Sequence, residues 1–136
     1  MNMSIETKKI KGETFLFKLK KGNITFSSYL SDIEKSREIE NLFIGLQTPM
    51  IYVISDREGN WEVVKGNDFV SALNDFIHGG MVLEGLEYFE SLEGGFSYET
   101  LPDYLKNLLN EIEITVVIIN PSTPADVRKN IIGRIK

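Results

Sequence analysis

The stretch EVVKGNDFVSALNDF, residues 62–76, predicts the end of a buried strand, a glycine turn and the start of an amphipathic helix. Such a turn can hold a phosphate, because the free N–H groups at a helix start favour negative charge. Here, however, Asp68 and Phe69 occupy positions where a phosphate would favour a cation. The stretch therefore predicts a strand–turn–helix unit and raises the question whether its turn still works as a site.

Hydrophobic patterns on both sides of this unit predict further helices and strands. The runs Met50–Ile54 and Trp61–Val64 predict a hairpin that leads into the turn. Ser31 and Glu34 have the spacing of a capping box, so we expect a helix from Ser31 to about Leu46. The other expected elements are a short strand at 24–26, a helix from Asn67 to Ile77, a helix at 101–109 capped by Thr100, a long central strand at 113–120 and a last helix with Val127, Ile131 and Ile135 on its apolar face.

Length and composition predict one domain over residues 1–136. Residues 12–20 fit a strand or a short helix equally well, and residues 1–11 are polar enough that we expect them to be flexible. Hairpin-paired strands with interspersed helices indicate an α+β fold, with a small mixed β-sheet flanked by helices.

Composition also excludes or disfavours several functional classes. The chain has no cysteine, which excludes disulfides, thiolate catalysis and cysteine-bound metal. Its single histidine, His78, precedes Gly79-Gly80 and is expected to cap a helix rather than to bind zinc. No apolar run reaches the length of a signal peptide or a membrane span, so we expect a cytoplasmic protein that does not contact a membrane.

The net charge of −5 is unevenly distributed along the chain. Residues 22–125 hold five basic and 17 acidic side chains, which argues against broad binding to duplex nucleic acid. Residues 1–21 hold six lysines against two glutamates, and residues 126–136 hold four basic side chains against one aspartate. We expect these basic ends to be solvated, with contact to an anionic partner as the alternative.

Four segments, in order along the chain, carry a resemblance to one family. The first reads S-R-E-I-E-N-L-F-I-G at residues 36–45, similar to the family pattern S-R-hydrophobic-I-E-S-L-L-hydrophobic-G, and is followed by Pro49–Tyr52. The others are Trp61–Gly66 with the helix to Phe76, then 83–96 with Leu101-Pro102, and finally Val116–Asn120 with Pro124, Val127 and 131–135. Over about residues 20–136 the chain resembles the DUF262 domain of GmrSD-type restriction systems and other phage-defence proteins. The resemblance implies a single domain with a ParB/sulfiredoxin-like fold, in a bacterial restriction-modification context.

The resemblance also implies a place for the chemistry of the family. In restriction proteins such domains are thought to bind and hydrolyse nucleoside triphosphates and to couple this to a separate nuclease domain. The family signature D-G-Q-Q-R lies at the strand-to-helix turn, where glycine admits a phosphate, arginine binds it, and aspartate holds a metal or water. A second signature, roughly P-x-F-Q-R, follows the first strand. The resemblance aligns the two signatures with Lys65–Phe69 and Ser27–Ser31.

Both signatures are degenerate in this sequence. Of the first, only Gly66 is kept, and the second has lost its glutamine and its arginine. Asn67 and Asp68 are good helix caps, so we expect them to cap their own helix, and the Asp68 carboxylate would repel a phosphate. We therefore expect a catalytically inactive domain without catalytic residues, metal site or cofactor.

Three functions remain open from the sequence. The first is a binding module that uses the remnant cleft to hold a nucleotide, a nucleic acid or a protein. The second is an active phosphohydrolase or nuclease-associated NTPase with altered residues, the only case that would need a nucleotide with magnesium. The third is a pure protein-interaction module. The kind of partner that the resemblance implies is a full-length or nuclease-bearing family protein. We expect residues 1–136 to lack the family's C-terminal helices and its nuclease domain.

The candidate ligand-binding residues of the remnant cleft come from three segments. Arg37 belongs to the helix of the first matched segment and faces either the cleft or an ion pair with Glu34 or Glu40. The full set is Lys65, Gly66, Asn67, Asp68, Arg37 and Tyr29.

Overall fold

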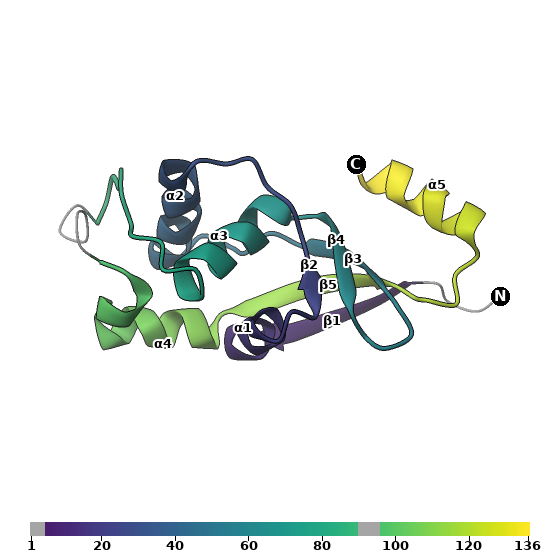
Figure 1. Ribbon diagram of the computed structural model, residues 1–136, viewed down its shortest axis with the longest axis horizontal. Helices are drawn as coiled ribbons and strands as arrows, with labels where there is room; N and C mark the ends of the chain where they lie inside the picture. Colours follow the sequence, from purple (N-terminus) through teal and green to yellow (C-terminus); the bar gives the residue numbers. More distant parts are fainter. Residues whose placement is uncertain (1–4, 90–95) are drawn as a thin grey trace.

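A computed structural model describes residues 5–89 and 96–136 (Figure 1). Within these residues a mixed sheet of five strands is flanked by five α-helices, which confirms the expected α+β fold. In chain order the elements are β1 Ile5–Lys11, α1 Gly12–Lys20, β2 Ile24–Thr25, α2 Asp32–Phe43, β3 Ile51–Ser55, β4 Trp61–Lys65, α3 Asn67–Ile77, the short 3₁₀ helix η2 Tyr98–Thr100, α4 Asp103–Glu111, β5 Glu113–Ile119 and α5 Ala125–Ile135.

The strands form one sheet in the order β1-β5-β3-β4-β2. β3 and β4 form the expected antiparallel hairpin, in which Ser55 lies opposite Trp61 and Val53 opposite Val63. β3 runs parallel to β5, β1 is antiparallel to β5, and β2 is parallel to β4. The strand expected to be central, β5, is thus an inner strand beside the middle strand β3.

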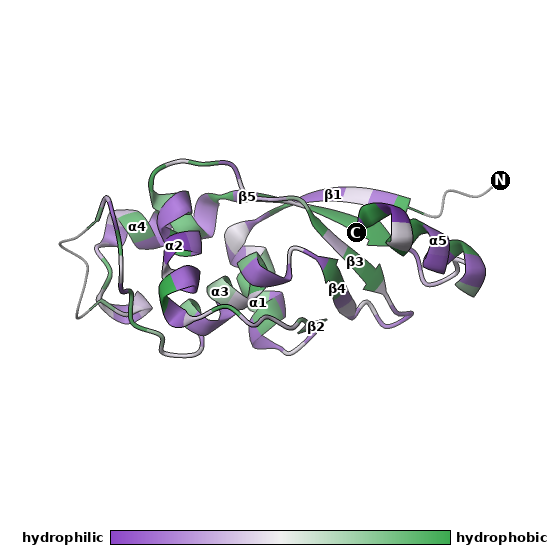
Figure 2. Cartoon of the chain, turned by 90° about the horizontal axis from the view of Figure 1, so that it is seen from above, coloured by the Kyte–Doolittle hydropathy of each residue, from purple (hydrophilic) through white to green (hydrophobic). Residues whose placement is uncertain are grey.

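The prediction that residues 1–11 are flexible is wrong for residues 5–11, which form β1, while residues 1–4 lie outside the described residues. Ile5 and Ile10 are half-buried opposite Ile119 and Ile114, and the side chains between them are exposed. Figure 2 shows hydrophilic colours along most of this strand. A polar segment can form an edge strand because its neighbour supplies the apolar surface, and its charges discourage pairing with other chains.

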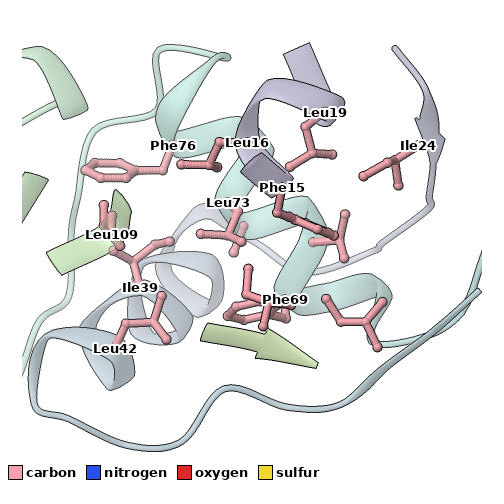
Figure 3. Packing of buried hydrophobic residues seen from close by; sticks show 14 of the residues in the cluster. Phe15, Leu16, Leu19, Ile24, Ile39, Leu42, Phe69, Leu73, Phe76 and Leu109 are labelled. Atoms are coloured by element: carbon pink, nitrogen blue, oxygen red, sulfur yellow. The ribbon is translucent and has the colours of Figure 1, made fainter. Parts of the chain in front are cut away.

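The main core lies between one face of the sheet and the helices α1 to α4. Figure 3 shows side chains of these helices converging, among them Phe15 of α1, Leu73 of α3 and Leu109 of α4. Phe15, Leu16 and Leu19 are buried at helical spacing, which settles residues 12–20 as a helix. A side-chain carbon at Gly12 would overlap the carbonyl oxygen of Leu109, so α1 needs a glycine where it meets α4.

Helix α2 begins as expected and ends early. Ser31 and Glu34 form the predicted capping box. The helix ends at Phe43 rather than near Leu46, because Gly45 takes a left-handed conformation with φ of 86° and closes the last turn. Leu46 therefore lies in the loop before β3.

Two predictions concern the ends of α3 and α4. His78 is the C-cap residue of α3, as expected, and its Nε2 lies 3.0 Å from the carbonyl oxygen of Leu16, which accepts the hydrogen bond. Thr100 does not cap α4, because it ends the short 3₁₀ helix, and Pro102 occupies the N-cap position before Asp103. His78 thus joins α3 to α1 in addition to closing its own helix.

Helix α5 stands apart from the other helices. In Figures 1 and 2 it lies at one end of the molecule, while α2 and α4 lie at the other. None of its side chains is fully buried; Val127 is exposed, and Ile131 and Ile135 of its expected apolar face are half-buried. No helix in the described residues is both long and apolar enough to cross a lipid bilayer.

Candidate functional site

The strand–turn–helix unit at Gly66 has the predicted shape. Gly66 takes φ of 100° between the end of β4 and the start of α3, a conformation that side chains with a Cβ rarely adopt. A Cβ at this position would also lie 3.2 Å from Cγ1 of Ile51. Gly66 is therefore required by backbone geometry and packing, independently of any ligand.

The structure brings together the two segments that the resemblance aligns with the family signatures. The backbone N–H of Ser27 donates to Oδ1 of Asn67 over 3.0 Å, and the hydroxyl of Ser28 donates to Oδ1 of Asp68 over 2.8 Å. Both bonds span 40 residues of sequence. The loop that precedes α2 is therefore held on the first turn of α3.

The expectation that Asn67 and Asp68 cap their own helix is wrong. No side chain caps α3, because Gly66 occupies the N-cap position and places Asn67 and Asp68 inside the first turn. Asn67 instead accepts from Ser27 and donates from Nδ2 to the carbonyl oxygen of Val63 over 3.4 Å. The polar side chains of the turn thus bond to protein groups on either side of it.

Two carboxylates and an apolar hollow lie beside this turn. Burial raises the pKa of Glu38, and the nearby negative charge of Asp68 raises it further. Glu38 also lines a hollow of about 240 Å³, whose other walls include Leu42, Leu46 and the buried ring of Phe69. Phe69, which the resemblance aligns with the arginine of the family signature, therefore lines this hollow together with the carboxylate of Glu38.

Lys65 does not join this group. Its Nζ donates to the carbonyl oxygen of Ile135 in α5 over 3.2 Å and lies 6.0 Å from the ring centre of Tyr52. The amine of this candidate ligand-binding residue thus contacts the end of α5, and within the described residues it forms no hydrogen bond with Asn67 or Asp68.

Arg37 and Tyr29 are exposed on the two sides of the α2 start. Nε of Arg37 donates weakly, over 3.4 Å, to the carbonyl oxygen of Gly85, and within the described residues Arg37 forms no ion pair with Glu34 or Glu40. The Tyr29 side chain is fully exposed, one residue after Ser28. The candidate residues therefore divide: Asn67 and Asp68 lie together, Tyr29 lies next to them in the loop, and Lys65 and Arg37 contact other segments.

Glu40 is unavailable to Arg37 because it is buried in a structural role. Its two carboxylate oxygens accept the backbone N–H groups of Glu87, Tyr88 and Phe89 at 2.8–3.1 Å. Lys35, on the same helix, forms an ion pair with Asp75 of α3 over 2.6 Å. These contacts fix α2 against α3 and against the segment before residue 90, so the α2–α3 arrangement is rigidly supported.

Sequence reasoning missed Glu38 and Ser28 as members of this site. A signal for Glu38 was present, since it lies four residues before Leu42 and hence on the same face of α2. The pairing of Ser28 with Asp68 had no local signal, because it depends on a tertiary contact. The described residues contain no group of three or more His, Asp or Glu side chains placed to hold a metal ion.

Comparisons with known proteins return no match: no family model, no curated protein and no solved structure resembles the chain. The DUF262 resemblance and the ParB/sulfiredoxin-like fold therefore stay predictions.

Proposed function

We propose that this chain is a non-catalytic, protein-binding module that uses one surface at the start of α2 and α3. This α2–α3 surface is defined by Tyr29, Glu38, Leu46 and Asp68. The pairing of Ser28 with Asp68 carries the proposal, because it commits the carboxylate to a hydrogen bond within the protein. A site with its polar groups already paired supports positioning of a loop rather than turnover of a ligand.

Electrostatics argue against a phosphate at this turn. Asp68 and Glu38 place two carboxylates beside the start of α3; burial raises the pKa of Glu38, and the negative charge of Asp68 raises it further. The nearest expected cations, Lys65 and Arg37, contact Ile135 and Gly85 instead. A phosphate would therefore approach two negative groups, and neither Lys65 nor Arg37 is placed to offset their charge.

The same features suit a protein partner. Tyr29 and Leu46 are exposed, and the hollow beside Leu46 is lined by Leu42, Pro49 and Phe69 together with the carboxylate of Glu38. Protein interfaces use this combination, in which an aromatic or aliphatic anchor enters a pocket and a charge at the rim selects the partner. The partner segment we propose carries an apolar side chain for the hollow next to a Lys or Arg for Glu38 and Asp68. In the phage-defence context that the resemblance suggests, it belongs to a cytoplasmic full-length or nuclease-bearing family protein.

The catalytic alternative is tested by nucleotide turnover. We expect the purified domain to release no phosphate from ATP or GTP, with or without magnesium, above a buffer control. Turnover that depends on magnesium and disappears in Asp68→Ala would contradict the proposal. Gly66 variants are unsuitable for this test, because any side chain there strains the turn.

The binding proposal is tested by selecting peptides from a random library against the immobilised domain. We expect enriched peptides to place Lys or Arg beside a large apolar residue, and to bind Glu38→Gln and Asp68→Asn more weakly by about tenfold. Glu58→Gln is the matched control, since Glu58 is an exposed carboxylate in the hairpin loop, outside this surface. An absence of enrichment, or peptides whose binding falls equally in the control, would refute the proposed surface.

A further inference from the structure

A larger hollow lies at the opposite end of β4 from Gly66. Its volume is about 740 Å³, compared with about 240 Å³ for the hollow beside Phe69. Its walls come from the turn after α1, the β3–β4 hairpin and the start of α5, three segments far apart in sequence. We call it the hairpin groove and define it by Asn23, Thr25, Arg57, Asn60, Trp61 and Arg128.

Two arginines from different segments line the hairpin groove without partners. Arg57 is exposed in the hairpin loop, and Arg128 is half-buried near the start of α5. Within residues 5–89 and 96–136, neither guanidinium forms a hydrogen bond or an ion pair. Lys18 and Lys65, by contrast, each donate to a backbone carbonyl. The groove thus offers two free planar donors, which bind oxyanions through paired hydrogen bonds.

Two acidic side chains, Asp56 and Glu62, also line the groove, and within the described residues neither forms an ion pair with these arginines. Asp56 accepts hydrogen bonds from the backbone N–H groups of Glu58 and Asn60 and from Nδ2 of Asn60. Its carboxylate is therefore committed to the hairpin loop. Glu62 is exposed and also lines the neighbouring hollow next to Ser27, on the side of β2.

The floor of the groove is rigid and partly polar. Nζ of Lys18 lies 4.3 Å from the ring centre of Trp61 and donates to the carbonyl oxygen of Gly59 over 2.7 Å, which fixes the hairpin to α1. The backbone N–H of Trp61 donates to the carbonyl oxygen of Asn23 over 2.8 Å. The amide side chain of Asn23 makes no hydrogen bond within the described residues, so it can recognise a polar group of a ligand.

From these observations we propose that the hairpin groove binds a small ligand that carries a multiply charged oxyanion, such as a phosphate ester or a polycarboxylate. The oxyanion lies between Arg57 and Arg128, and the body of the ligand extends along Trp61 toward Asn23. This site is separate from the α2–α3 surface, so neither proposal depends on the other.

The test is a titration of the intact domain with pyrophosphate and, separately, with citrate at constant ionic strength. Trp61 is the only tryptophan of the chain and lines the groove, so its fluorescence reports on the site directly. We expect saturable binding of at least one of the two anions, with calorimetry giving one site. Preference for pyrophosphate assigns a phosphate ligand, and preference for citrate assigns a carboxylate ligand.

Variants connect the binding to the two arginines. We expect Arg57→Gln and Arg128→Gln each to weaken binding by about tenfold, and the double variant to abolish it. Arg134→Gln is the matched control, because Arg134 is an exposed arginine on the same helix that does not line the groove. No binding of either anion by the wild-type domain, or equal weakening by Arg134→Gln, would overturn the proposal.

Discussion

The two ends of β4 differ in how their polar side chains are used. At Gly66, the side chains of Asn67 and Asp68 bond to Ser27 and Ser28, and the turn is closed. At Trp61, the guanidiniums of Arg57 and Arg128 line an open hollow and have no hydrogen-bond or ion-pair partner in the part of the chain that the structure describes. The strand–turn–helix pattern around Gly66 drew attention to the first end, because a helix start of this kind can hold a phosphate. The difference teaches that such a turn can have its polar side chains committed to supporting a loop, whereas unpaired charges around a hollow mark where a ligand can bind.

The largest expected effect tests how much the stability of the domain depends on glycine at position 66. Gly66→Ala should lower the free energy of unfolding by about 3 kcal/mol, because it adds backbone strain and a close contact with Ile51. Gly59→Ala is the control at the other end of β4: Gly59 has φ of 85° but open space around it. Strain alone should cost that variant about 1 kcal/mol. Urea unfolding measures both, and equal losses would show that Ile51 does not restrict the turn.

A smaller effect tests whether Ser28 and Asp68 stabilise the closed turn. Ser28→Ala, Asp68→Ala and the double variant form a double-mutant cycle, and we expect a coupling energy of about 1 kcal/mol. Coupling near zero would mean that the 2.8 Å hydrogen bond does not hold the loop in solution. The same cycle on Arg57 and Arg128 should give no coupling, because within the described residues neither guanidinium forms a hydrogen bond or an ion pair.

The smallest effect concerns two carboxylates whose pKa values shift in opposite directions. Burial raises the pKa of Glu38 above its ordinary value of 4.5, so its contribution to stability falls as the pH rises through that range. Hydrogen bonds, first that from the backbone N–H of Asn60, lower the pKa of Asp56 below 3.8, so its contribution is present at neutral pH and is lost in acid.

Thermal unfolding at several pH values measures this contrast. Glu38→Gln should be more stable than the wild-type domain at pH 7, by less than about 1 kcal/mol because Glu38 is partly solvated, and the gain should vanish near pH 3. Asp56→Asn should show the reverse, with a loss at pH 7 that disappears in strong acid. Changes in stability of the same sign at pH 7 in both variants would contradict the opposite pKa shifts of Glu38 and Asp56.

Local patterns in the sequence were sufficient for much of the fold. The capping box at Ser31, the hairpin before Gly66 and the glycine turn itself depend on neighbouring residues, and the structure has all three. The sequence did not reveal β1, because a polar edge strand is recognisable only beside the apolar strand that it covers. A local sequence pattern therefore predicts a helix or strand when the residues that pack against it lie nearby in the chain.

The candidate site was less accessible to sequence reasoning. The contact between Ser28 and Asp68 spans 40 residues, and only the family resemblance suggested that their segments meet. Helix-capping preference pointed to Asn67 and Asp68 as self-caps, but Gly66 took the N-cap position and freed both side chains for tertiary bonds. The hairpin groove depends on three separate segments, so no pattern within one of them could have indicated it.

The pairing of β1 with β5 has a consequence for how the chain is made. Of the strands that the structure describes, β1 leaves the ribosome first and β5 last, and Ile5 pairs with Ile119. Because synthesis proceeds from the N-terminus, β1 must wait unpaired until nearly all of the domain has been translated, while the β3–β4 hairpin can form earlier. While β1 is unpaired, its exposed charges keep it hydrated and discourage it from pairing with the sheet of a neighbouring nascent chain. These charges are on Lys8, Lys9 and Lys11.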